Sequence, residues 1–220
     1  MSVLIIASTV NVFVGSDDLY RWGFNKYQIA ARTGINDEQL SEVAKSMAGY
    51  LAGSSKSPQL SVSINGQQRL LYNQKELVHL EDVRMIVWLF QLLQMISIAV
   101  FIIIGMVLYF RKGTPLLLQG AKIGAAIVIG ITGLLVVWSL IDFNSLFYLF
   151  HLISFSNDLW ILDPTRDYLI MMFPQRFFYD SAIFMVISIL VAAIILMIAS
   201  ALLYRIILRS EKSTLNAGAR

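Results

Sequence analysis

Three long apolar runs constrain this chain more than any other feature of its sequence. They cover about 83–110, 119–141 and 182–204, and each exceeds the roughly 20 helical residues that cross the hydrocarbon core of a bilayer. A chain inside a bilayer satisfies its backbone hydrogen bonds only as a helix or a closed barrel, and runs this continuous favour helices. The sequence therefore predicts an integral membrane protein built on transmembrane helices.

A fourth apolar segment opens the chain at 1–14 and is too short to span a bilayer comfortably. It has neither the basic start of a signal peptide nor a convincing small-residue cleavage site. We interpret it as a first transmembrane segment whose start is cut short. Counting this segment, we expect an all-α membrane protein, a four-helix transmembrane bundle.

The basic residues predict the orientation of the bundle, because cytoplasmic loops carry an excess of lysine and arginine. The connection 111–118 contains Arg111, Lys112 and no acidic residue, and the tail 205–220 contains four basic residues against one acid. The loop 142–181 contains two basic residues against five aspartates. We expect 111–118 and 205–220 in the cytoplasm, and 15–82 and 142–181 on the extracytoplasmic side of the membrane.

The segment 15–82 is predicted to fold as a small extracytoplasmic α+β head. Asn36 and Gln39 have the spacing of a capping box, and apolar residues at helical spacing follow as far as Leu51. Asn65-Gly66 lies between alternating apolar residues, which is a strong β-hairpin signal. A helix is then expected to run from Lys75 directly into the membrane.

Composition excludes several kinds of function. The chain has no cysteine, which excludes disulfides, a thiolate nucleophile and a cysteine metal site. Its net charge is only +3, the basic residues lie mainly at membrane edges, and no glycine-rich nucleotide loop occurs. We therefore expect no nucleic-acid partner and no cofactor.

The chain has only two histidines, His79 and His151, and the predicted topology brings both to the same side of the membrane. His79 lies between Glu76 and Asp82, and a spacing of three puts all of these side chains on one helix face. Imidazoles at a lipid–water boundary are candidates for acid–base catalysis. The alternative is a solvated helix end in which the carboxylates are simply polar.

His151 belongs to an aromatic segment that also contains polar residues, namely Asn157, Trp160, Asp163 and Asp167. Aromatic residues favour membrane interfaces, which explains the rings but not the interleaved polar side chains. The two histidines lack the close spacing of common zinc motifs. A metal-dependent hydrolase stays open as an alternative, although we expect no metal.

Two motifs resemble those of the bacterial lipoprotein intramolecular transacylase family. They are E-x-x-H-x-x-D-V at 76–83 and F-H-x-x-x-F-x-N-x-x-W-x-x-D-P-x-x-D at 150–167, followed by Phe-Pro at 173–174. The resemblance implies an enzyme in the cell membrane that acts on diacylglyceryl lipoproteins. It would move the sn-2 acyl chain from glycerol oxygen to the amine of the N-terminal cysteine.

The family's two histidines match His79 and His151, which the resemblance makes the catalytic pair. We expect His79 as the base and His151 as the acid, with the reverse assignment left open. Glu76, Asp82 and Asp167 are candidate orienting residues, Asn157 and Trp160 are candidate hydrogen-bond donors, and Asp163 is a further supporting candidate. The competing hypothesis is a non-catalytic membrane protein that binds lipid or a partner through its head and aromatic loop.

Overall fold

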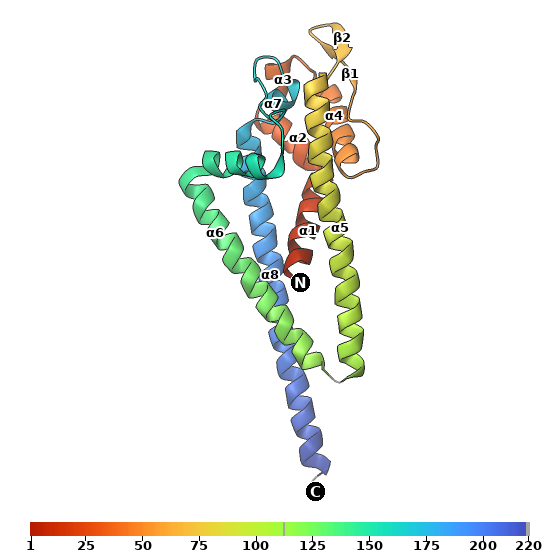
Figure 1. Ribbon diagram of the computed structural model, residues 1–220, viewed down its shortest axis with the longest axis vertical. Helices are drawn as coiled ribbons and strands as arrows, with labels where there is room; N and C mark the ends of the chain where they lie inside the picture. Colours follow the sequence, from red (N-terminus) through yellow and green to blue (C-terminus); the bar gives the residue numbers. More distant parts are fainter. Residues whose placement is uncertain (112, 219–220) are drawn as a thin grey trace. The chain divides into compact units, whose positions relative to one another are not determined.

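The computed structural model describes residues 1–111 and 113–218, with side chains described as far as 209. Lys112 and Arg220, both used above to predict orientation, lie outside the described residues, and the side chains of Glu211 and Lys212 do as well. The described elements, labelled in Figure 1, are α1 (Ser2–Val14), α2 (Asp17–Lys26), α3 (Ile29–Thr33), α4 (Asp37–Leu51), β1 (Ser61–Ile64), β2 (Gln67–Leu70), α5 (Gln74–Phe110), α6 (Thr114–Ser154), α7 (Tyr168–Met172) and α8 (Gln175–Gly218).

The chain divides into two compact units, each assembled from separate stretches of sequence. One unit contains Met1–Thr9, Leu92–Val137 and Val186–Arg220, and the other contains Val10–Gln91 and Trp138–Met185. We call them the helical unit and the mixed unit. The expected head at 15–82 is thus part of a larger unit that also includes residues following the second apolar run.

Three helices, α5, α6 and α8, are long and apolar enough to cross a membrane, and each contains one of the predicted apolar runs. The pair α1 and α2 passes the same test only as one broken span with a bend of 61°. The described residues therefore provide three candidate spans, or four if this bent pair is counted. A multi-pass membrane protein is confirmed at this level.

Small side chains bring α1 and α6 together inside the helical unit. Ser2 Oγ donates to the carbonyl oxygen of Gly124 at 2.9 Å, and a Cβ at Gly124 would lie 3.3 Å from that of Met1. Ala125 and Ala193 belong to the same buried cluster, against which Ile5 and Ile6 pack. Small residues at a helix contact allow close backbone approach, which stabilises helix pairs in lipid.

The mixed unit has the larger buried core. Apolar side chains of α2, α3, α4, β1 and α7 form one core with Leu80 of α5. Figure 1 shows these elements grouped around the first turns of α5. An aromatic cluster ties α2 to the residues around the start of α8: the Tyr20 and Phe24 rings lie 5.6 and 5.3 Å from that of Phe173. The Phe177 ring also packs closely against α2 at Gly23, because a Cβ at that position would overlap the ring.

Local signals correctly predicted two small elements of this unit, helix α4 and the hairpin of β1 and β2. Asn36 caps α4 by accepting a hydrogen bond from Gln39 N at 2.8 Å. The hairpin turns at Asn65 and Gly66, whose φ angles of 51° and 81° are those of a tight hairpin turn. The side chain of Gln39 does not complete a capping box; its amide can instead pair with the backbone of Ser63 on β1.

The segment 142–181 differs from the loop that we expected. Helix α6 continues to Ser154 after a kink at Asp142, where φ and ψ are −155° and 88°. The Asp142 carboxylate accepts a hydrogen bond from Ser145 N at 3.1 Å and so caps a second helical stretch. Only residues 155–167 and a short link between α7 and α8 are irregular. The kink at Asp142 precedes the helical stretch that carries His151.

Candidate functional site

The two histidines face each other within the mixed unit. Their ring centroids lie 6.4 Å apart with an interplanar angle of 27°. His79 comes from the second turn of α5 and His151 from the last turn of α6, and both are buried, with exposed fractions of 7% and 8%. The fold thus brings together two titratable groups that are separated by more than seventy positions in the sequence.

A hydrogen bond fixes the orientation and tautomer of His151. Its Nδ1 lies 2.7 Å from the carbonyl oxygen of Phe147, one helical turn earlier. A carbonyl oxygen can only accept a hydrogen bond, so Nδ1 carries the proton and acts as the donor. In the neutral ring, Nε2 then has a free lone pair and can accept a proton.

His79 is held differently. Its Nδ1 is buried without a hydrogen-bond partner among the described residues, and no hydrogen bond fixes its tautomer. The ring is positioned by packing instead, with the Phe155 ring edge-on at 5.0 Å. A buried nitrogen without a partner is uncommon in folded proteins and often marks a functional position.

Aromatic rings surround the pair. The rings nearest to His151 by centroid distance are Phe147 at 4.4 Å, Trp160 at 4.9 Å, Phe150 at 5.3 Å and Phe155 at 5.6 Å. Phe155 touches both imidazoles. This apolar surface excludes water, and it also offers a surface against which acyl chains can pack.

Glu76 joins the start of α5 to the start of α7. Its Oε2 accepts from Asn73 N at 2.7 Å, while Asn73 Oδ1 accepts from Glu76 N at 3.0 Å, which makes a capping box at the helix start. Its Oε1 accepts from Leu169 N at 2.6 Å. Glu76 is only 1% exposed, and its carboxylate bonds to backbone rather than to His79.

Asp82 holds the same segment on the other side of His79. Its Oδ2 accepts a hydrogen bond from Asn157 Nδ2 at 2.9 Å, and the amide oxygen of Asn157 accepts from Leu159 N at 3.0 Å. The Lys75 ammonium also donates to the carbonyl oxygen of Ile161. The 155–169 segment is therefore fastened to α5 both before and after His79.

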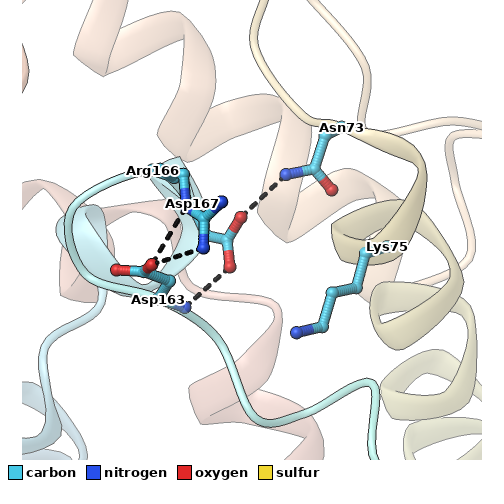
Figure 2. A pocket seen from close by; sticks show the side chains of 5 residues that line it. All are labelled: Asn73, Lys75, Asp163, Arg166 and Asp167. Atoms are coloured by element: carbon cyan, nitrogen blue, oxygen red, sulfur yellow. Dashed lines mark hydrogen bonds and ion pairs between the residues drawn. The ribbon is translucent and has the colours of Figure 1, made fainter.

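Asp167 and Asp163 organise the turn between these contacts, as Figure 2 shows. Asn73 Nδ2 donates to Asp167 Oδ1 at 2.8 Å, and Asp167 Oδ2 accepts from Asp163 N at 2.7 Å. Hydrogen bonds from Thr165 and Arg166 hold the pKa of Asp163 down at about 2. A pocket of about 310 Å³, into which Lys75 reaches, is lined by Asn73, Lys75, Asp163, Arg166 and Asp167.

The structure gathers every sequence-predicted candidate around one segment. Glu76, His79 and Asp82 lie on one face of α5, and Trp160 stacks near His151. The hydrogen bonds of Glu76, Asp82 and Asp167 go to Asn73 and to the 155–169 segment instead of to an imidazole. Sequence reasoning missed Asn73, Phe147 and Phe155; the Asn73-x-x-Glu76 capping pattern was a usable signal for the first of these.

Among the residues whose side chains are described, no group of three or more histidines, cysteines or carboxylates is arranged to hold a metal ion. The two imidazoles inside their apolar enclosure have the chemistry needed to accept and donate protons.

Comparisons with known proteins identify the family of the chain and solved structures with a similar fold. The family model described as lipoprotein intramolecular transacylase Lit matches residues 1–178. A solved structure of the membrane integral Lit from Bacillus cereus superposes with a TM-score of 0.77 at 23% identity, covering 96% of this chain and 93% of that chain. A variant of the same protein with one histidine replaced by arginine gives a TM-score of 0.73 at 22% identity, covering 97% and 89%. No curated protein matches the chain.

Proposed function

Because the chain belongs to the lipoprotein intramolecular transacylase family, we propose that it moves the sn-2 acyl chain of a diacylglyceryl lipoprotein from glycerol oxygen to the N-terminal cysteine amine. His79 and His151 are the general acid–base pair of this reaction. The observation that carries the proposal is the pair of facing, buried imidazoles, 6.4 Å apart, in an aromatic enclosure.

The hydrogen bond of His151 favours the reverse of the role assignment first considered. With its Nδ1 proton engaged by Phe147, His151 presents Nε2 as a ready acceptor and is the better general base. His79 has no such bond, so either nitrogen can carry its proton. His79 is then the acid that protonates the departing glycerol oxygen.

The reaction balances with these two groups alone. The amine attacks the ester carbonyl and gives up a proton to His151, and a tetrahedral intermediate forms. When the C–O bond to glycerol breaks, His79 donates its ring proton to the alkoxide from one nitrogen and accepts the proton of His151 at the other, leaving an N-acyl amide and a free hydroxyl. Both imidazoles end neutral, and no acyl-enzyme intermediate is required.

Positioning is the larger part of the task, because amine and ester belong to one substrate molecule. Orientation of two reacting groups is worth up to roughly 7–11 kcal/mol of the barrier. The Glu76 and Asp82 contacts support this proposal, since they hold the segment that follows His151 on both sides of His79. These two carboxylates are positioning residues rather than catalytic ones.

Trp160 is the candidate donor to the oxyanion or to the glycerol oxygen. Its ring lies 4.9 Å from that of His151, and its indole N–H has no recorded acceptor among the described residues. The amide of Asn157, the other donor first considered, is already engaged by Asp82 and Leu159. A preorganised N–H donor near the reacting carbonyl stabilises the developing negative charge.

The decisive experiment expresses this protein with a reporter lipoprotein in a host that lacks N-acylation. Mass spectrometry of the N-terminal peptide is expected to find an N-acyl, mono-acylglyceryl product with the wild type. His79→Ala and His151→Ala are each expected to leave the diacylglyceryl peptide unchanged. The matched control is Lys45→Ala on the exposed face of α4, which is expected to retain full conversion.

Conversion by either histidine variant at the wild-type rate would contradict the catalytic pair. No conversion by a folded, membrane-inserted wild type would instead favour the non-catalytic binding protein. A mono-acylglyceryl peptide with a free amine, which no longer forms when a chelator is added, would point to the metal-dependent hydrolase class.

A further inference from the structure

A second hollow of the mixed unit lies on a different face of α5 from the histidines. It has a volume of about 590 Å³ and is lined by residues from the end of α4, the following loop and α5: Tyr50, Lys56, Ser57, Pro58, Leu77, Glu81, Arg84, Met85 and Trp88. The α5 residues recur at helical spacing and form one stripe. We call this hollow the α4–α5 groove.

The lining of the groove includes two cations. The Arg84 guanidinium lies 4.6 Å from the centroid of the buried Tyr50 ring, which holds it by a cation–π contact while leaving its N–H groups free. The Lys56 side chain is exposed and lines the same groove. Neither cation has an ion pair among the described residues, so two positive charges face the groove against the single carboxylate of Glu81.

The groove also has an exposed apolar lining. Met85 and Trp88 are 61% and 55% exposed although both are large hydrophobic side chains. Both lie at the start of the first long apolar run, where tryptophan favours the boundary between headgroups and acyl chains. Gln91 Nε2 donates to the carbonyl oxygen of Ala52 at 3.2 Å, which keeps the end of α4 against α5 along this stripe.

We propose that the α4–α5 groove binds one anionic phospholipid. Arg84 and Lys56 take the phosphate, for which a guanidinium has matching hydrogen-bond geometry, and the acyl chain lies along Met85 and Trp88. Glu81 accepts a hydrogen bond from a headgroup hydroxyl. This site is separate from the histidine pair and does not depend on the proposed acyl transfer.

Native mass spectrometry of the purified full-length chain tests the proposal directly. The protein is titrated with phosphatidylglycerol and with phosphatidylcholine, and we expect a one-lipid complex that forms selectively with phosphatidylglycerol. Removing each cation should weaken this complex about fivefold, so Lys56→Gln/Arg84→Gln should weaken it by more than tenfold. The control Lys45→Gln/Arg69→Gln removes the same charge from exposed positions outside the groove and should bind like the wild type.

Trp88→Ala keeps both cations and, because Trp88 is exposed, leaves the fold intact; it should weaken phosphatidylglycerol binding through lost apolar contact. Equal binding of both lipids, or equal loss in the control variant, would overturn the proposal. Displacement of the lipid by an equal concentration of glycerol phosphate would also overturn it, because the groove would then be a soluble-phosphate site.

Discussion

At the scale of single residues, the hydrogen bond between His151 and Phe147 gives the clearest test of the acid–base assignment. Asparagine can reproduce the Nδ1–H donor of histidine and glutamine can reproduce the Nε2 acceptor, but neither amide is basic. We expect His151→Asn and His151→Gln to insert normally and to lose roughly 10²–10⁴-fold in N-acylation rate. Retention of more than a tenth of the rate by either variant would show that His151 is not the base.

Glu76 is expected to act through the fold. Its two carboxylate oxygens accept from Asn73 N and Leu169 N, and a glutamine would turn its NH₂ group toward one of these donors. Glu76→Gln should lower the free energy of unfolding by about 1–3 kcal/mol. Thermal unfolding in detergent measures the change, and Glu81→Gln, at an exposed position of the same helix, is the matched control. Equal midpoints for the two variants would contradict the role of Glu76.

At this scale, the sequence predicted which side chains share one face of α5 but not which groups they bond to. The spacing of Glu76, His79 and Asp82 follows directly from helical periodicity. Their partners could not be deduced, because Leu169 and Asn157 lie 93 and 75 positions away and no short-range rule pairs them. We expected these carboxylates to bond to the nearby imidazole of His79. They bond instead to backbone and amide groups that are distant in the sequence.

At the scale of elements, the hydrogen bond between Asp82 of α5 and Asn157 of the 155–169 segment can be tested by exchanging these two side chains. Asn157→Asp places two carboxylates opposite each other, so local hydrogen exchange in this segment should rise and N-acylation should fall. The double variant Asp82→Asn/Asn157→Asp restores one donor and one acceptor and should recover most of both. Absence of any recovery would show that the Asp82–Asn157 hydrogen bond does not hold the segment.

Elements with a strong local signal, such as the hairpin, could be predicted from the sequence. The helical stretch 143–154, which begins at the capping residue Asp142, could not. Asn65-Gly66 determines its hairpin because both positions adopt positive φ. The helical stretch 143–154 was expected as a loop because its aromatic residues are equally typical of a membrane interface. The Asp142 side chain, which caps this stretch, was counted only as a negative charge.

At the scale of the whole molecule, the predicted orientation places the mixed unit outside the cytoplasm. The absence of cysteine allows single-cysteine labelling without further changes. In intact cells, a membrane-impermeant maleimide should label Gln67→Cys on the hairpin and should leave Thr114→Cys unlabelled until the membrane is permeabilised. The opposite labelling pattern would invert the topology and place the histidines on the cytoplasmic side.

Each of the two units combines separate stretches of the chain, which explains why their limits were difficult to predict from the sequence. Apolar runs predict spans because a bilayer demands length and hydrophobicity. The core of the mixed unit, however, combines residues of the expected head with Leu169, Met172, Phe173 and Phe177, which follow the second span. An interpretation of the sequence that takes one segment at a time assigns these four residues to a loop between two spans.

The hydrogen bonds between α5 and the 155–169 segment can form only after the ribosome has made both partners. A ribosome makes His79 long before His151, and Phe177, which completes the core around these residues, comes later still. The nascent chain therefore lacks the complete histidine pair throughout the synthesis of its earlier helices. Under the proposed function, we expect a chain that is stalled before His151 to leave lipoprotein substrates unmodified.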